Sequence, residues 1–327
     1  MSKTGEMRHG EAMRRYLLAS VALGVIATWA SENLFWSAPP ERGSALEFGI
    51  TCVAYGICCA AALTAVLVTG VGGWVAVFGG ACLLGWLVEG VVVDTMYAAV
   101  PFQLVWTPVA WHGLVSGLLI LGLSRAAGRW PVLRHLGACL LVGLMMGVWA
   151  WYWPGERGPL VADLRSTAYL VVPGLAAVGA SLLLDRVGEV SLPRRRWVAW
   201  LAPGLLAAVW TIKLVASGNP ILLMLPLVVL AALWVLRRLG RPGQPLSLGP
   251  AGGWRHLNLL AVPLVATGIG AWGWAAYPQG VAVNVGLATA LSGIGVGLWW
   301  VLLRRALRTE RAPTGVGSDP PAPGLRS

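Results

Sequence analysis

The sequence predicts an all-α fold, a polytopic membrane helix bundle of about ten transmembrane helices. Three observations predict it: 57% of the 327 residues are hydrophobic, only 11% are charged, and the apolar residues form long uninterrupted runs. Soluble domains contain about 25% charged residues, and a water-soluble fold of this length could not bury so much apolar surface. A bilayer accepts such surface directly when the backbone is helical.

Ten stretches approach or reach the roughly 20 apolar residues with which a helix crosses a bilayer. The turn at residues 71–73 is so short that the second and third stretches should form a helical hairpin. The loop at 240–254 is rich in Gly and Pro and is expected to be flexible. The expected spans are residues 16–36, 48–69, 73–93, 103–123, 136–153, 166–184, 197–217, 220–236, 257–277 and 281–303.

The basic residues alternate between the loops and predict the orientation. Most of the 24 Lys and Arg fall on the N-terminal arm, on alternate loops and on the C-terminal tail. The positive-inside rule then predicts that both termini are cytoplasmic, and we expect the protein in a membrane of the bacterial cytoplasmic type. This distribution also explains the net charge of +11. It favours membrane lipids as partners and argues against nucleic acid.

The chain divides into three predicted parts. Residues 1–15 form a cytoplasmic basic arm, residues 16–304 a transmembrane helical domain, and residues 305–327 a cytoplasmic basic, Pro-rich tail that is expected to be disordered. The apolar run after the arm lacks a clear small-residue cleavage site, so the first span is expected to stay in the protein as an anchor.

Glu32, Glu89, His112 and Lys213 lie within the predicted spans, and Asp94 lies at a rim. The predicted threading places all five on the extracytoplasmic side. An ionisable group in hydrocarbon costs roughly 2.5–3.5 kcal/mol on insertion scales, so such groups are functional candidates by default. We predict that the two glutamates and His112 are catalytic and share one polar cavity, because a hydrated pocket lowers all three penalties.

Aromatic and polar residues near the same helix ends are predicted to bind the substrate, since indole rings can cover an apolar ligand. Each also has a structural interpretation: Asp94 as a solvated loop residue, Lys213 as a side chain that reaches the interface, and the carboxylates as halves of ion pairs. Ser116 continues the face of His112. The predicted substrate-binding residues are Asn33, Asp94, Trp106, Trp111 and Lys213.

Neither a metal nor a cofactor is expected. The five cysteines lie within spans without CxxC spacing, and the other three histidines fall on the opposite side from His112. The chain has no HExxH, Walker A or GxSxG motif. Small residues recur at packing spacings, at Gly80 and Gly85 and at Gly113 and Gly117, and predict the close approach of neighbouring helices.

Two functional hypotheses from different classes fit these features. The favoured one is a membrane-embedded enzyme that acts by acid/base chemistry on a lipid or isoprenoid-like amphiphile, which enters from the outer leaflet. The alternative is a ten-helix proton-coupled secondary transporter, in which two groups of five spans would form an inverted repeat. A further alternative is a non-catalytic membrane assembly protein.

Overall fold

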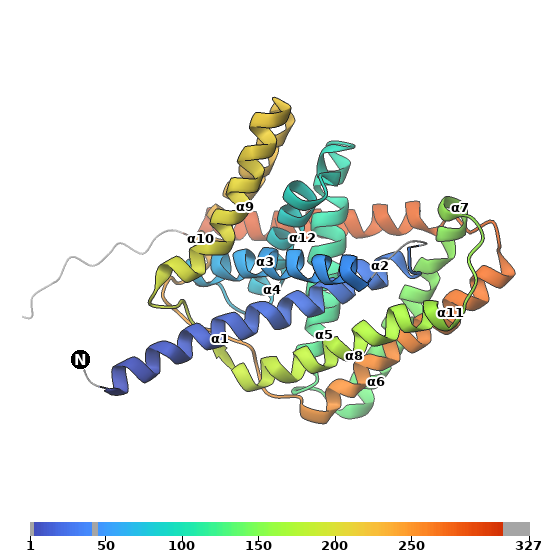
Figure 1. Cartoon of the computed structure of the whole chain (residues 1–327), viewed down its shortest axis with the longest axis horizontal. Helices are drawn as coiled ribbons and strands as arrows, with labels where there is room; N and C mark the ends of the chain where they lie inside the picture. The colour runs from blue at the N-terminus through green and yellow to red at the C-terminus, as the bar shows by residue number, and fades with distance from the viewer. Residues whose placement is uncertain (1–2, 41–44, 310–327) are drawn as a thin grey trace, which may run out of the picture.

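The computed structural model describes residues 3–40 and 45–309 and shows a bundle built almost entirely of helices (Figure 1). Within these residues, ten helical spans are long and apolar enough to cross a membrane, which confirms the predicted fold class. The spans are Gly10–Trp36, Leu46–Thr69, Gly73–Val92, Phe102–Ala126, Val132–Arg157, Leu164–Val187, Arg196–Ser217, Pro220–Leu239, Gly253–Ala276 and Val283–Arg308.

The spans are not all regular α-helix. Three of them contain π-helical segments, which carry an i→i+5 hydrogen-bond pattern and a wider turn. The α-helices are α1 (Lys3–Thr28), α2 (Leu34–Trp36), α3 (Ala45–Thr69), α4 (Gly73–Leu87), α5 (Gly122–Ala126), α6 (Val132–Trp149), α7 (Trp153–Arg157), α8 (Leu164–Val187), α9 (Arg196–Ser217), α10 (Met224–Leu239), α11 (Ala261–Ala276) and α12 (Val283–Arg308). The π-helical segments are η1 (Trp29–Asn33), η2 (Val88–Val92) and η5 (Trp106–Leu121). The 3₁₀ turns are η3 (Thr95–Tyr97), η4 (Phe102–Leu104), η6 (Ala150–Tyr152), η7 (Pro220–Leu223) and η8 (Gly253–Leu260), and the strands are β1 (Glu189–Val190) and β2 (Leu246–Ser247).

Helices extend into the predicted arm at one end of the described chain and into the predicted tail at the other. Helix α1 begins at Lys3, so much of the predicted arm is helical. Helix α12 continues to Arg308, so residues 305–308 of the predicted disordered tail belong to a helix. Residues 310–327 lie outside the described residues, and the three-part division of the chain stays a prediction.

The loop at 240–254, which its composition predicts to be flexible, makes backbone hydrogen bonds to neighbouring turns. Strand β2 pairs antiparallel with β1 from the loop after α8. The amide of Arg241 donates to the carbonyl of Gly70 at 3.0 Å, and the amide of Leu248 donates to the carbonyl of Gly188 at 2.9 Å. These contacts satisfy several backbone groups of the loop, and its flexibility stays a prediction.

Large apolar side chains cover the outside of the bundle. Helix α9, drawn in yellow in Figure 1, packs mainly against α3, and only Ala199 and Leu206 on it are buried. Its exposed residues include Leu201, Ile212 and Val215. A soluble monomer rarely exposes so much contiguous apolar surface, whereas the hydrocarbon of a bilayer contacts it without penalty.

The core that positions the polar residues is formed by the first four spans together with α8. Helix α4 packs along η5, and α1 lies between α3 and α8. The fifth and ninth spans pack against each other through α6 and α11. The buried polar residues lie where α1, α3, α4 and η5 meet.

Candidate functional site

The three predicted catalytic residues all lie in π-helical segments. Glu32 belongs to η1, Glu89 to η2 and His112 to η5. A π-helical turn interrupts the regular pattern of backbone hydrogen bonds and re-aims the side chains on it, and such turns are frequent at functional sites. Hydrophobic periodicity does not reveal these segments, because the spans are apolar on nearly every face.

Small residues let α4 and η5 approach closely, as the glycine spacing predicts. A Cβ atom added at Gly85 would lie 2.6 Å from Cα of Pro108 and 2.9 Å from Cβ of His112. A Cβ at Gly113 would lie 2.5 Å from Sγ of Cys82. The absence of side chains at these positions therefore brings the backbone of α4 against His112 and places Glu89, one turn further along, within its reach.

The His112 imidazole is hydrogen-bonded at both nitrogens in the interior of the protein. Nε2 lies 3.1 Å from Oε1 of Glu89, and Nδ1 lies 3.0 Å from Oγ of Ser31. His112 is 2% exposed and Glu89 is 8% exposed. The second carboxylate oxygen of Glu89 accepts a short hydrogen bond from the hydroxyl of Thr95. We call these four residues the His112 cluster.

Glu32 lies beside this cluster in a hydrogen-bonded group of its own. Its Oε1 accepts from the hydroxyl of Tyr55 at 2.8 Å, and its Oε2 accepts from Nε1 of Trp36 at 3.1 Å. The ring of Tyr55 lies 6.1 Å from the His112 ring, centroid to centroid. The structure thus brings Glu89 and His112 into contact and places Glu32 one tyrosine ring away from them.

Ser116 connects the His112 cluster to a large pocket. Its Oγ lies 2.8 Å from Oγ of Ser31, which in turn contacts His112. Ser116 also lines a pocket of about 390 Å³ between α1, α3, α4 and η5. The same pocket extends to Gly73, Arg125 and Arg129, at the arginine-bearing ends of the helices. This direction is opposite to the expected opening among the helix ends that carry Glu32 and Glu89.

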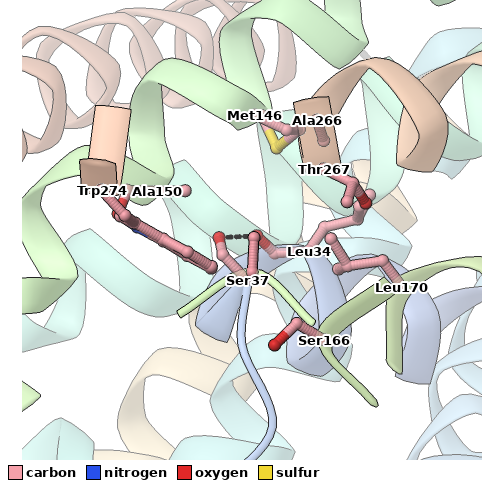
Figure 2. Close-up of a pocket in the computed structure, with 10 residues that line it drawn as sticks. Leu34, Ser37, Met146, Ala150, Ser166, Leu170, Ala266, Thr267 and Trp274 are labelled. Atoms are coloured by element: carbon pink, nitrogen blue, oxygen red, sulfur yellow. Dashed lines mark hydrogen bonds between the residues drawn. The ribbon is translucent and has the colours of Figure 1, made fainter. Parts of the chain in front are cut away.

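A smaller cavity, shown in Figure 2, lies between α2, α6, α8 and α11. Its volume is about 10 Å³, which is room for about one water molecule. The hydroxyls of Ser37, Ser166 and Thr267 in its wall each donate to a nearby backbone carbonyl, those of Leu34, Val161 and Pro263. We therefore do not assign this cavity to the site.

Trp106 and Trp111 lie in an aromatic cluster next to the polar residues. The ring of Trp111 lies 4.7 Å from that of Phe35 and 5.0 Å from that of Trp149, and its Nε1 donates to the carbonyl of Ala30. The ring of Trp106 packs on Trp149 at 5.8 Å. Both indoles are buried, so they form a wall behind the His112 cluster instead of lining the pocket at Ser116.

The other predicted substrate-binding residues lie apart from the cluster. Nδ2 of Asn33 donates to the carbonyl of Tyr169 on α8, and its Oδ1 is buried without a partner among the described residues. Nζ of Lys213 bonds both oxygens of Asp94, at 2.9 and 2.8 Å. This exposed ion pair ties α9 to the turn before η3.

Three members of the site lie outside the sequence-based prediction: Ser31, Tyr55 and Thr95. Their hydroxyls resemble those of other Ser, Thr and Tyr residues in apolar spans, where a hydroxyl commonly bonds its own helix. The one available signal is that Ser31 directly precedes Glu32. Among the described residues, no group of three or more His, Cys, Asp and Glu is placed to hold a metal ion.

The arrangement is suited to moving a proton. The chain Thr95, Glu89, His112, Ser31 and Ser116 is continuous in hydrogen bonds, and each hydroxyl can donate and accept at once. No family model, curated protein or solved structure matches this chain.

Proposed function

We propose that this protein is a membrane-embedded enzyme that acts on a lipid or isoprenoid-like amphiphile by acid/base chemistry. The observation that carries the proposal is the position of the buried His112 imidazole between the carboxylate of Glu89 and the hydroxyl of Ser31. A histidine oriented by a carboxylate and facing a hydroxyl is the arrangement in which an imidazole acts as a general base or acid.

The contacts permit proton transfer between the pocket and His112 in either direction. With its proton on Nε2, His112 donates to Glu89, and Nδ1 accepts from the hydroxyl of Ser31. A proton that leaves a ligand at Ser116 then passes through Ser116 and Ser31 to Nδ1. Glu89 stabilises the imidazolium that forms, because opposite charges attract strongly where water is excluded. The reverse sequence of transfers makes His112 the general acid.

Glu32 supplies a second carboxylate within the same interior region. In this proposal it orients Tyr55, from whose hydroxyl it accepts a hydrogen bond, and its negative charge adds to the stabilisation of a protonated His112. Trp106 and Trp111 exclude water from behind the cluster. The apolar walls of the pocket at Ser116 favour an amphiphile as the ligand.

Lipid extracts test the proposal whichever amphiphile is the substrate. Cells expressing the wild type, Glu89→Gln, His112→Gln or Gly179→Ala at equal membrane levels are compared by mass spectrometry. Gly179 is a matched control because a Cβ there meets nothing within 4 Å. We expect one lipid species to change with the wild type and Gly179→Ala and to stay unchanged with the other two. Identical extracts from all four strains would contradict the enzyme.

A second proposal, proton-coupled transport, is favoured by one observation. The hydrogen-bonded chain runs from Thr95, in the turn between two spans, to a pocket that reaches the opposite helix ends. The expected inverted repeat lacks support: α1 packs along α3, but the described residues of α8 and α9 make no comparable contact. Proteoliposomes under a pH gradient separate the two proposals. Proton uptake that needs Glu89, together with unchanged lipids, favours transport, and no change in either readout favours an assembly role.

A further inference from the structure

We propose that the pocket at Ser116 binds an amphiphile with one anionic head group, that the head group lies at Arg129, and that the chain lies toward Ser116. This inference rests on the proposed function, because it names the substrate class of the same site. It is based on the two arginines at one end of the pocket and on the apolar character of its walls.

Two arginines lie at the open end of the pocket, and their environments differ. Arg125 is neutralised: its Nη2 lies 2.5 Å from Oδ1 of Asp185, and its Nε donates to the carbonyl of Leu248. Within the described part of the chain, the guanidinium of Arg129 has no hydrogen-bond or ion-pair partner. It lies against Gly249, where an added Cβ would be 2.9 Å from Nη2. Arg129 is exposed, so this end of the pocket presents one arginine without a counter-charge from the described residues.

The guanidinium of Arg129 offers several N–H donors in a planar fork, which match the oxygens of a phosphate or carboxylate. Between this end and Ser116 the lining is mainly apolar and includes Leu23, Leu63 and Leu118. Such a wall gives no partner to a second polar group but accepts an acyl or prenyl chain. Charge at one end and apolar wall along the rest together specify an anionic amphiphile.

This placement has a consequence for the chemistry. Ser116 and Arg125 are nine residues apart on one continuous helix, which is at most about 14 Å, the length at an α-helical rise. With the head group at the arginine end, the part of the ligand next to Ser116 is its chain. Ser116 then faces the chain of the ligand and not its head group.

The test uses dodecyl phosphate as the probe and thermal unfolding of the full-length protein in detergent as the readout. A ligand that binds the folded state raises the unfolding temperature. We expect dodecyl phosphate to stabilise the wild type, and dodecanol and inorganic phosphate to stabilise it far less. Arg129→Gln should weaken the affinity for dodecyl phosphate about tenfold or more. Leu118→Trp, which fills the half-buried wall, should weaken the affinity for both long-chain probes.

Arg134→Gln is the matched control. Arg134 is on the next helix and does not line the pocket, but it stacks at 4.5 Å over the ring of Trp130, which does. If Arg129→Gln and Arg134→Gln lost the same affinity for dodecyl phosphate, the overall positive charge of the surface would explain the binding. This result would overturn the proposal. Equal stabilisation by inorganic phosphate and dodecyl phosphate would also overturn it.

The binding test is independent of the proposed reaction. Glu89→Gln leaves the pocket unchanged and should bind dodecyl phosphate with the affinity of the wild type. If the wild type binds the probe as expected but its lipid extracts do not differ from those of Glu89→Gln, the enzyme proposal fails and the binding site stands. If the lipids change and Arg129→Gln binds normally, the head-group assignment fails alone.

Discussion

The Nε2 atom of His112 lies 3.1 Å from Oε1 of Glu89, so that residues from two separate spans form one hydrogen-bonded pair in the interior. Both partners come from π-helical segments, η5 and η2. The pair is held from one side by Thr95 and from the other by Ser31. Its surroundings allow predictions that separate a chemical role from a structural one.

The first prediction concerns the charge of Glu89. In Glu89→Gln the amide oxygen can accept from His112 and the amide nitrogen can donate to Thr95, so both hydrogen bonds persist. We expect this variant to unfold within about 1 kcal/mol of the wild type while losing activity. Glu89→Leu leaves His112 and Thr95 without an acceptor, at about 1–3 kcal/mol for each stranded group.

Circular dichroism melting of both variants in detergent is the measurement. Equal losses of stability in Glu89→Gln and Glu89→Leu would show that the charge itself holds the fold. The pair would then be a structural ion pair, and the acid/base interpretation would lose its main support.

The second prediction concerns the close contact of α4 with η5. In Gly85→Ala the new methyl group meets backbone atoms of Pro108 at 2.6 Å, so the two helices must separate. We expect a loss of about 1–3 kcal/mol of unfolding free energy, and a displaced His112. Gly179→Ala on α8 enters open space and should be neutral or up to about 1 kcal/mol more stable. If Gly85→Ala and Gly179→Ala unfolded at the same temperature, the close contact of α4 with η5 at Gly85 would be contradicted.

The third prediction contrasts two ion pairs. Asp185 bonds Arg125 at 2.5 Å and also accepts from His256 and the amide of Gly252, with little exposure of either charged side chain. Asp185→Ala leaves the Arg125 guanidinium without a counter-charge, and we expect a loss of about 3–5 kcal/mol.

The comparison is Asp94→Asn, which removes the charge that pairs with Lys213. The side chains of Lys213 and Asp94 are 31% and 47% exposed, so solvent screens the pair and about 0–1 kcal/mol should be lost. Asp94 has a positive φ of 62°, a conformation that Asn tolerates well. Urea or thermal unfolding of both variants measures the two losses of unfolding free energy. A larger loss in Asp94→Asn than in Asp185→Ala would contradict this prediction.

The fourth prediction is the orientation in the membrane. Reporter fusions after Arg129, Arg196 and Arg241 should report the cytoplasm, and a fusion after Arg157 should report the opposite side, because basic loops are retained inside. A single basic loop found outside would invert or break the predicted threading. The side of the membrane that Glu32 and Glu89 face would then change with it.

The sequence by itself determined the number and position of the spans, because apolar length and composition are local properties. All ten expected ranges correspond to helical spans of the structure. It also marked Glu89 and His112, since an ionisable side chain in an apolar run is conspicuous whatever its neighbours in space are. The glycines at 85 and 113 indicated that their helices pack closely.

Only the tertiary structure decided what each polar side chain contacts. In a membrane helix nearly every face is apolar, so periodicity does not reveal how a helix is rotated against its neighbours. Glu32, Glu89 and His112 also lie in π-helical segments, whose wider turns direct side chains differently from a regular α-helix. As a result of this packing, His112 contacts Ser31 and Glu32 accepts a hydrogen bond from Tyr55. The ring of Trp111 packs within the aromatic cluster. The pocket at Ser116 depends on the crossing of four helices, and its direction toward Arg129 follows from that crossing.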